Sequence, residues 1–495
     1  MLRKLTLAIA AVALLASPAF AAVQNVKVSG KIDSSYIYRD RFDLGSQVNN
    51  NRRNQSFGLT QTLLRVDADL SDNVQATVQL LNERAWGGST IEVTDTNSDT
   101  FTIDGGRNVV DINLAYVTLR EFLYSPLTVV VGRQILHYGN GFIIGDGGPN
   151  NSGSGNIGRF AGDLTLATAH DAVKVVLDYK PLTVDLFVSK ENANNLTGGV
   201  ISTTSVRSTG AKNDDVDLFG VNANYQLGDD MNSVVEAYFF GKIDRSSNTS
   251  TSSPRAKTDK VYVPGLRAST NPISGLNVQG EVAWQTGVRT GSTVNERRDA
   301  LGVQGIINYQ VTQEDVEKYK PVVQGVYTFV SGDADPNATD VTGAGAKRSK
   351  FNGWDPMFEA QASGKIYNAL FNLTNAHIAE VSAAITPIED VTTKLSWTQL
   401  WSVESLDRQL SSTPSGLGSG SFLVQPDGSS VSGTAVTSNR HLGQEIDADI
   451  MYNYTEDVLF GLSLGMFLPG DAFAETASVS RKTASQAIAH VAVTF

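Results

Sequence analysis

The chain has no cysteine and almost no long apolar segment. The absence of cysteine excludes disulfides, cysteine zinc sites and thiol catalysis. One run, from Leu5 to Leu15, is almost entirely apolar, but its eleven residues fall short of the roughly 20 that a membrane-spanning helix needs. We therefore expect no helical membrane span, and the run needs another explanation.

That run lies in a segment with the pattern of a signal peptide. Arg3 and Lys4 precede it, and Ala19-Phe20-Ala21 follows it with small residues at the two positions that a signal peptidase requires. We expect cleavage after Ala21, which leaves residues 22–495 as the mature chain. The alternative, an N-terminal anchor helix, is disfavoured by the shortness of the run. The sequence thus predicts an exported protein.

Positive charge is also scarce. The chain has 39 Lys and Arg against 51 Asp and Glu, which gives a net charge of −12. This balance argues against a nucleic-acid partner and against a basic face for anionic lipid. Hydrophobic residues make up only 41% of the chain, which is low for a bundle of membrane helices. The value suits a barrel in which every second strand residue faces lipid.

From Val26 onward the hydropathy alternates with a period of two. Apolar Val26, Val28 and Ile32 share one parity, whereas Lys31 and Asp33 occupy the other. Such alternation predicts strands with one apolar and one polar face. It recurs in about eighteen segments, near residues 26–38, 57–70, 74–86, 108–121, 127–136, 168–179, 182–190, 214–226, 231–243, 259–269, 275–287, 298–310, 319–331, 376–386, 390–403, 441–454, 458–468 and 484–495.

Short and long polar connections alternate between these segments, as they do in outer-membrane barrels. The predicted fold class is therefore all-β: a transmembrane antiparallel β-barrel of about 18 strands with short periplasmic turns and long extracellular loops. We expect one domain, residues 22–495, in the outer membrane. A soluble β-sandwich or β-helix is the alternative, but it would not alternate its loops so regularly.

The last predicted strand ends in Phe495, and Val491 and Val493 share its parity. A terminal aromatic residue on an amphipathic strand resembles the signal by which outer-membrane barrels are recognised for insertion. We therefore expect two partners, the barrel-assembly machinery and outer-membrane lipid.

Polar residues opposite the apolar parity should face the inside, which is a water-filled channel in a barrel of this size. Fourteen residues are candidates for lining it: Arg65, Asp67, Gln79, Glu83, Lys174, Asp178, Asp185, Glu236, Glu281, Glu380, Lys394, Glu445, Asp447 and Asp449. Carboxylates predominate among them, and charged rings select ions by sign, so we expect a preference for cations or neutral solutes. Alternatively, many of these residues pair across strands and brace the wall.

Five blocks of sequence carry a family pattern. They are residues 115–145 (AYVTLREFLYSPLTVVVGRQILHYGNGFIIG), 170–179 (HDAVKVVLDY), 327–333 (YTFVSGD), 351–358 (FNGWDPMF) and 442–473 (LGQEIDADIMYNYTEDVLFGLSLGMFLPGDAF). The motif positions are Gly132, Arg133, Gln134, Tyr138, Gly139, Ser331, Gly332, Asp333, Pro469, Gly470 and Asp471. In this order the blocks resemble the alginate export family. The resemblance implies a monomeric barrel of eighteen strands that passes a polysaccharide or a small solute.

Alginate itself fits the predicted lumen poorly. The family's alginate-exporting channel is electropositive with many arginines, whereas carboxylates predominate among the candidates here. Arg133 has the parity of Val129 and Val131, which are expected to face lipid. We therefore expect a different solute, such as an ion, a small solute or a saccharide.

Two functions of different class remain. The first is a passive channel, and the second is a structural or surface-binding barrel with a plugged lumen. A channel requires that a long connection, either 137–167 or 332–375, constricts the lumen without sealing it. The five histidines are scattered without zinc-ligand spacing, so we expect no metal site, no cofactor and no enzymatic activity.

Overall fold

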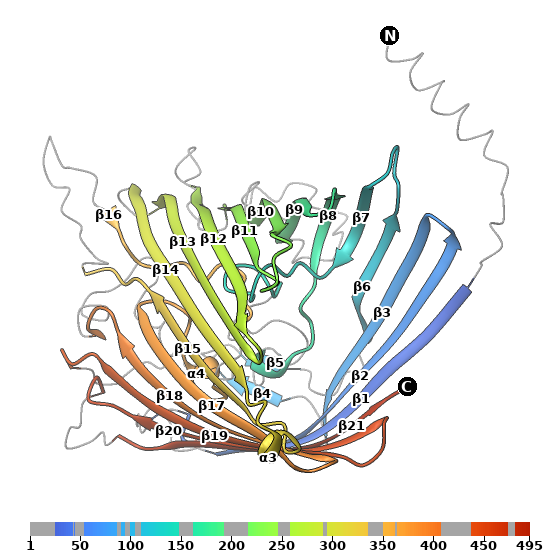
Figure 1. Ribbon diagram of the computed structural model, residues 1–495. Coiled ribbons are helices and arrows are strands. Elements are labelled where there is room, and N and C mark those ends of the chain that lie inside the picture. Colours follow the sequence, from blue (N-terminus) through green and yellow to red (C-terminus); the bar gives the residue numbers. More distant parts are fainter. Residues whose placement is uncertain are drawn as a thin grey trace, which may run out of the picture.

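The computed structural model describes residues 25–42, 44, 54–86, 91–94, 100–103, 110–147, 162–192, 216–245, 258–290, 295–334, 350–361, 364–406, 437–473 and 481–495. Within these residues, eighteen antiparallel strands each hydrogen-bond to the next along the chain. The last strand pairs with the first, so the sheet closes into a barrel (Figure 1). The predicted fold class is confirmed. The predicted signal peptide, residues 1–21, lies outside the described residues.

The barrel strands coincide in order with the eighteen predicted segments. They are β1 (Asn25–Asp40), β2 (Asn54–Ser71), β3 (Val74–Ala85), β6 (Val110–Leu119), β7 (Leu127–Gln134), β8 (His170–Asp178), β9 (Leu182–Asn192), β10 (Val216–Gln226), β11 (Val234–Asp244), β12 (Asp259–Ile273), β13 (Leu276–Thr290), β14 (Asn295–Gln310), β15 (Val322–Val330), β17 (Ala376–Ile388), β18 (Val391–Ser402), β19 (His441–Asn453), β20 (Val458–Pro469) and β21 (Ala484–Thr494). No helix in the described part of the chain is long and apolar enough to cross a membrane.

The pairing of β1 with β21 closes the barrel. Their register runs from Lys31 opposite Thr494 to Asp40 opposite Ser485. Gly30 and Phe495 extend the pairing with two backbone hydrogen bonds of 2.8 and 3.0 Å. Closure gives each of the eighteen barrel strands a partner on both sides, and this matters in lipid, where an unsatisfied backbone N–H or C=O group is strongly unfavourable.

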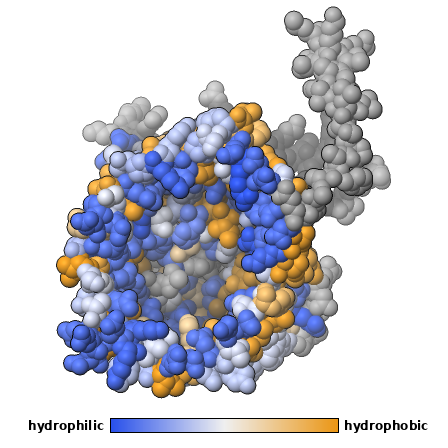
Figure 2. Space-filling model, turned by 45° about the vertical axis from the view of Figure 1, so that its right-hand side comes forward, coloured by the Kyte–Doolittle hydropathy of each residue, from blue (hydrophilic) through white to orange (hydrophobic). Residues whose placement is uncertain are grey.

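The two faces of each strand differ as the alternation predicts. On β19, Ile446 and Ile450 point outward and are 45% and 44% exposed, whereas Glu445 and Asp447 point inward and are almost completely buried. Figure 2 shows hydrophilic residues around the hollow of the molecule and hydrophobic residues on parts of its outer surface. The outer surface therefore suits lipid, and the inner surface suits water and polar groups.

Both ends of the barrel sheet lie on the side of the short turns. The first residue of β1, Asn25, pairs with Asp69 just before the β2–β3 turn. At the other terminus, the Thr494 N–H donates to the Asp457 carbonyl in the β19–β20 turn at 2.9 Å. The β14–β15 turn on this side contains a short helix, α3 (Glu314–Glu317).

The long connections contain small elements that the sequence did not predict. β4 (Ile91–Thr94) and β5 (Thr100–Ile103) form a separate two-stranded sheet. β16 (Lys350–Phe351) adds to β14 in parallel beyond the paired part of β15. These strands are too short to span a membrane, which takes about 9–11 residues, and too short to show an alternation.

The barrel wall depends on a glycine of the family pattern. Gly132 on β7 has a φ of +123°, and a Cβ atom there would lie 2.2 Å from the Ala115 carbonyl oxygen on β6. We expect Gly132→Ala to destabilise the barrel by more than about 1 kcal/mol, because it adds both a clash and a strained backbone. The temperature at which the folded band disappears in SDS gel electrophoresis should fall. Gly305→Ala is the matched control, since no atom lies within 4 Å of its Cβ position. Equal midpoints for the two variants would contradict this account.

Candidate functional site

Two connections fold into the barrel. The first inward segment comprises residues 135–147 and 162–169, between β7 and β8, and includes the short 3-10 helix η1 (Gly162–Leu164). The second inward segment comprises residues 350–361 and 364–375, between β15 and β17, and includes the helix α4 (Tyr367–Leu370). These are parts of the two connections that the sequence indicated as possible constrictions.

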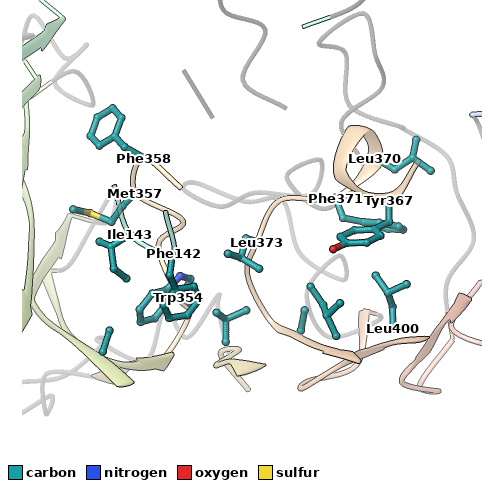
Figure 3. Packing of buried hydrophobic residues seen from close by; sticks show 14 of the residues in the cluster. Phe142, Ile143, Trp354, Met357, Phe358, Tyr367, Leu370, Phe371, Leu373 and Leu400 are labelled. Carbon is teal, nitrogen blue, oxygen red and sulfur yellow. The ribbon is translucent and has the colours of Figure 1, made fainter. Parts of the chain in front are cut away.

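The two segments pack against each other in an apolar cluster. Ile144 and Phe358 form a parallel bridge, and the Ala360 N–H donates to the Gly141 carbonyl at 2.8 Å. The ring of Phe142 stacks on Trp354, with 5.6 Å between centroids, and both side chains are fully buried (Figure 3). Beneath them lies Gly302 of β14, where a Cβ atom would come within 2.9 Å of both rings. The inward segments therefore form a core of their own against the barrel wall.

The second segment is anchored to β11, β13 and β14 through Asp355. Its backbone N–H and C=O form two hydrogen bonds with the side-chain amide of Gln285, at 2.8 and 2.7 Å. Its carboxylate lies 2.5 Å from Lys242 and 3.6 Å from Arg298. Burial alone would raise the pKa of Asp355, but the two cations hold it at about 2.

A stacked aromatic side chain strengthens this anchor. The Phe351 ring is almost completely buried beneath two guanidinium groups, at 4.0 Å from Arg289 and 5.5 Å from Arg298. Arg289 also pairs with Glu296 at 2.9 Å, and Arg298 with Asp259 at 2.8 Å. Cation–π contacts of this kind are strongest where water is excluded. Wall arginines thus bind the segment by charge and by stacking.

The far end of the second segment is bound by Glu445 of β19. Its carboxylate accepts hydrogen bonds from the backbone N–H groups of Lys365, Ile366 and Tyr367 at 2.5, 2.7 and 2.8 Å. The Lys365 ammonium group lies 3.2 Å from Asp449 on the same strand. Three backbone donors on one carboxylate satisfy groups at the start of α4 that would otherwise lack partners.

The first segment is bound by β9, β11 and β12. Arg267 donates to Glu236 at 2.5 Å and to the Asn140 side chain at 3.3 Å. Gly139 has a φ of +57°, and a Cβ atom there would lie 2.9 Å from the Arg267 side chain. The preceding Tyr138 ring stacks on Phe187 of β9 at 5.4 Å. The Tyr-Gly pair of the family pattern therefore docks this segment on the wall.

The end of the first segment contacts the opposite wall, β1 to β3. Glu83 accepts hydrogen bonds from Gln61 at 2.7 Å and from the Thr165 hydroxyl at 2.9 Å. Arg39 of β1 pairs with Asp163 at 2.5 Å and donates to Gln486 of β21. This segment therefore crosses the barrel interior between two walls.

All fourteen candidates for lining the lumen lie on inward-facing strand positions, but the structure does not gather them at one place. Arg65 pairs with Asp67 at 2.8 Å, and Lys394 lies 3.9 Å from Glu380. Three others accept a hydrogen bond from a wall side chain: Gln79 from Asn113, Asp178 from Thr183, and Glu281 from Tyr238. Lys174 and Asp185 face inward on the neighbouring strands β8 and β9, and Asp447 lies between Glu445 and Asp449 on β19. Several of these residues are therefore bound to other side chains of the wall, and Glu83 and Glu445 are bound to an inward segment.

Three residues of the family pattern that follow β15 hold the second inward segment. After β15, the Ser331 hydroxyl donates to the Asn352 carbonyl at 2.7 Å, and Asp333 accepts from the Asn352 N–H at 3.1 Å. Gly332 lies between them, tight against the Asn375 side chain. At the end of β20, Gly470 follows Pro469 and donates to the Leu442 carbonyl at 2.8 Å.

Three other residues of the family pattern have roles in the barrel wall or at its rim. Gln134 is buried and donates to the Ala172 carbonyl at 2.9 Å. Arg133 faces outward, as its parity indicates, and pairs with Asp171 at 3.1 Å. Asp471 pairs with Arg481.

The sequence reasoning missed most of the inward basic residues. Arg39, Lys242, Arg289 and Arg298 all face inward and form ion pairs. Arg39 and Arg289 lie just beyond the predicted segments 26–38 and 275–287, whereas Lys242 and Arg298 lie within 231–243 and 298–310. All four share the parity of inward neighbours, so the alternation could have identified them. Lys365 could not have been found in this way, since its segment has no period.

The comparisons with known proteins agree with this architecture. The sequence pattern of the alginate export family matches residues 206–486, more than half of the chain. The chain belongs to the alginate export family. A search of the curated proteins finds no match.

Solved structures of Pseudomonas aeruginosa barrels share the fold. OccK11 (OpdR) is 12% identical, with a TM-score of 0.52 and 96% of each chain covered. OpdK with vanillate is 10% identical, with a TM-score of 0.52, 96% of this chain and 99% of that chain covered. OccD3 (OpdP) is 11% identical, with a TM-score of 0.51, 96% of this chain and 92% of that chain covered. At these identities the likeness establishes the fold alone, a porin-like outer-membrane barrel.

The anchoring of the second segment leads to a pH-dependent prediction. Because the pKa of Asp355 is lowered from 3.8 to about 2, its ion pairs stabilise the fold above pH 3.8, and this contribution is lost as the pH falls to 2. We expect Asp355→Asn to reduce stability at neutral pH by about 2 kcal/mol, and the difference from the native chain to vanish near pH 2. Thermal unfolding in detergent across this range measures it. Asp390→Asn, in the exposed β17–β18 turn, is the control. A difference that is independent of pH would refute the assignment.

Proposed function

We propose that the chain is an outer-membrane channel through which small solutes, ions or saccharides diffuse down their gradients. The main support is the polar, charged inner wall of a closed barrel with an apolar outer surface. A barrel of this strand number is too wide to be filled by wall side chains alone. The two inward segments narrow the interior and would set the size limit. Membership of an export family and the likeness to porins favour transport over catalysis.

The distribution of charge supports a preference for cations or neutral solutes. Several inward carboxylates have neutral partners: Glu83 is held by Gln61 and Thr165, and Glu445 by three backbone N–H groups. The inward arginines, by contrast, are engaged in ion pairs. Carboxylates without a counter-charge, such as Glu83, would give the interior a negative field, which attracts cations and opposes anions.

Two other functions have specific support. A polysaccharide export pore is suggested by the family, although a polyanion such as alginate would meet the carboxylates of the wall. A barrel with a sealed lumen and a structural or surface-binding role is suggested by the apolar core of the inward segments. Conductance separates the sealed barrel from both kinds of pore.

We further propose that the chain is exported with cleavage after Ala21, and that residues 22–495 form one barrel domain and act as a monomer. The C-terminal strand supports recognition by the barrel-assembly machinery, since the Phe495 side chain faces outward and is 62% exposed.

Reconstitution into planar bilayers tests the channel. We expect discrete conductance steps, and a reversal potential in a salt gradient that indicates cation preference, because the interior field is negative. No conductance over a range of salt concentrations would reject the channel, and anion preference would reject the proposed selectivity.

The role of the second inward segment as a constriction has a separate test. Glu445→Ala removes the acceptor for three backbone N–H groups at the start of α4, so we expect the segment to loosen and single-channel conductance to rise. Glu389→Ala, in the exposed β17–β18 turn, should conduct like the native chain. Unchanged conductance in a folded Glu445→Ala barrel would show that this segment does not limit the pore.

A further inference from the structure

A row of basic residues crosses the outer face of the barrel on the side of the long connections. Lys260 of β12 lies opposite Val288 of β13, which in turn lies opposite Arg297 of β14. Lys350 of β16 lies opposite Arg297 on its other side, and Figure 1 shows β16 beside this end of β14. The residues that follow Lys260 and Arg297 are buried toward the interior, so these two cations point outward. Lys260, Arg297 and Lys350 are called the basic row below.

The acidic residues of the same face do not balance the basic row. Lys350 pairs with Asp299 at 2.6 Å, and Arg297 acts on the same carboxylate through its charge. Asp299 is the one carboxylate among the described outward residues of β12, β13, β14 and β16, so positive charge is left over. Like charges on directly opposed residues, such as Arg297 and Lys350, also repel each other. An anion bound from outside would therefore stabilise the row.

The surface next to the basic row has the character of a membrane interface. Trp284 of β13 is 47% exposed, and its indole N–H donates to Asp299 at 3.0 Å. Val282 and Leu301, which are also exposed, continue the apolar surface toward the middle of the barrel. Exposed tryptophan is typical of the headgroup level, beside the hydrocarbon. The row begins four residues beyond Trp284, or about 13 Å along the strand, on the water side. It therefore lies at the level of lipid phosphates.

We propose that the basic row binds the phosphate groups of an outer-leaflet lipid, with Arg297 and Lys350 at one phosphate and Lys260 at a second. Two strand spacings, about 10 Å, separate Lys260 from Arg297, so long side chains can serve two phosphates of one headgroup. The arginine fork suits a phosphate because it donates two parallel hydrogen bonds. The acyl chains would lie against Val282 and Leu301.

The site is compatible with the acidic balance of the whole chain, which argues against a broad basic face. It needs only three cations placed together. Because the row faces lipid rather than the interior, the inference does not depend on the proposed channel function.

Lipid A, which carries two phosphate groups, is a suitable probe, and a phosphate-free form of the same lipid is its counterpart. Binding to the purified full chain in detergent is measured by native mass spectrometry. We expect lipid A to bind at least about tenfold more tightly than its phosphate-free form, and Arg297→Gln and Lys350→Gln each to lose about fivefold in affinity for lipid A. Lys318→Gln, in the exposed β14–β15 turn at the other end of β14, is the matched control and should bind like the native chain.

Three results would overturn the site. Equal affinity of the native chain for the two lipids would reject phosphate recognition, whether or not the variants fold. Displacement of lipid A by excess inorganic phosphate would indicate a site for free phosphate, because the acyl chains would then contribute nothing. A loss of affinity as large in Lys318→Gln as in Lys350→Gln would reject the location of the site.

Discussion

The structure depends on one constraint: in lipid, every backbone N–H and C=O group must find its partner within the protein. The pairing of β1 with β21 meets this constraint by closing the sheet, so each of the eighteen barrel strands has a partner on both sides. Closure around eighteen strands then fixes a wide interior. The alternation along each strand follows from the same geometry, because successive side chains must face lipid and interior in turn.

The two inward segments occupy part of this wide interior. They bury their own apolar side chains, such as Phe142 and Trp354, in a core that is separate from the lipid-facing surface. They are fixed by charge: Asp355 lies between Lys242 and Arg298, and Glu445 binds the start of α4. Charged wall residues are thus used largely for positioning, so the charge available to a solute is smaller than a count of inward residues suggests.

The barrel could be predicted from the sequence because its physical cause has a simple period. Alternation such as that of Val26 and Val28 against Lys31 and Asp33 indicates both the strand and its inward face, and the order of eighteen strands followed. The inward segments have no period, and their apolar residues are not distinguishable from loop residues in the sequence. The surroundings of Glu359 combine the second inward segment with β15, β17, β18 and β19, so only the three-dimensional structure brings these residues together. Arg39 and Arg289 were missed because the alternation was not followed to the ends of their strands.

The central claim is that small solutes pass through the barrel. Swelling of liposomes that contain the purified chain, measured with neutral sugars of increasing size and with sugar acids, tests this claim most directly. The account predicts swelling whose rate falls with the size of the sugar and is slower for a sugar acid than for a neutral sugar of the same size. No swelling with even the smallest sugar would contradict it.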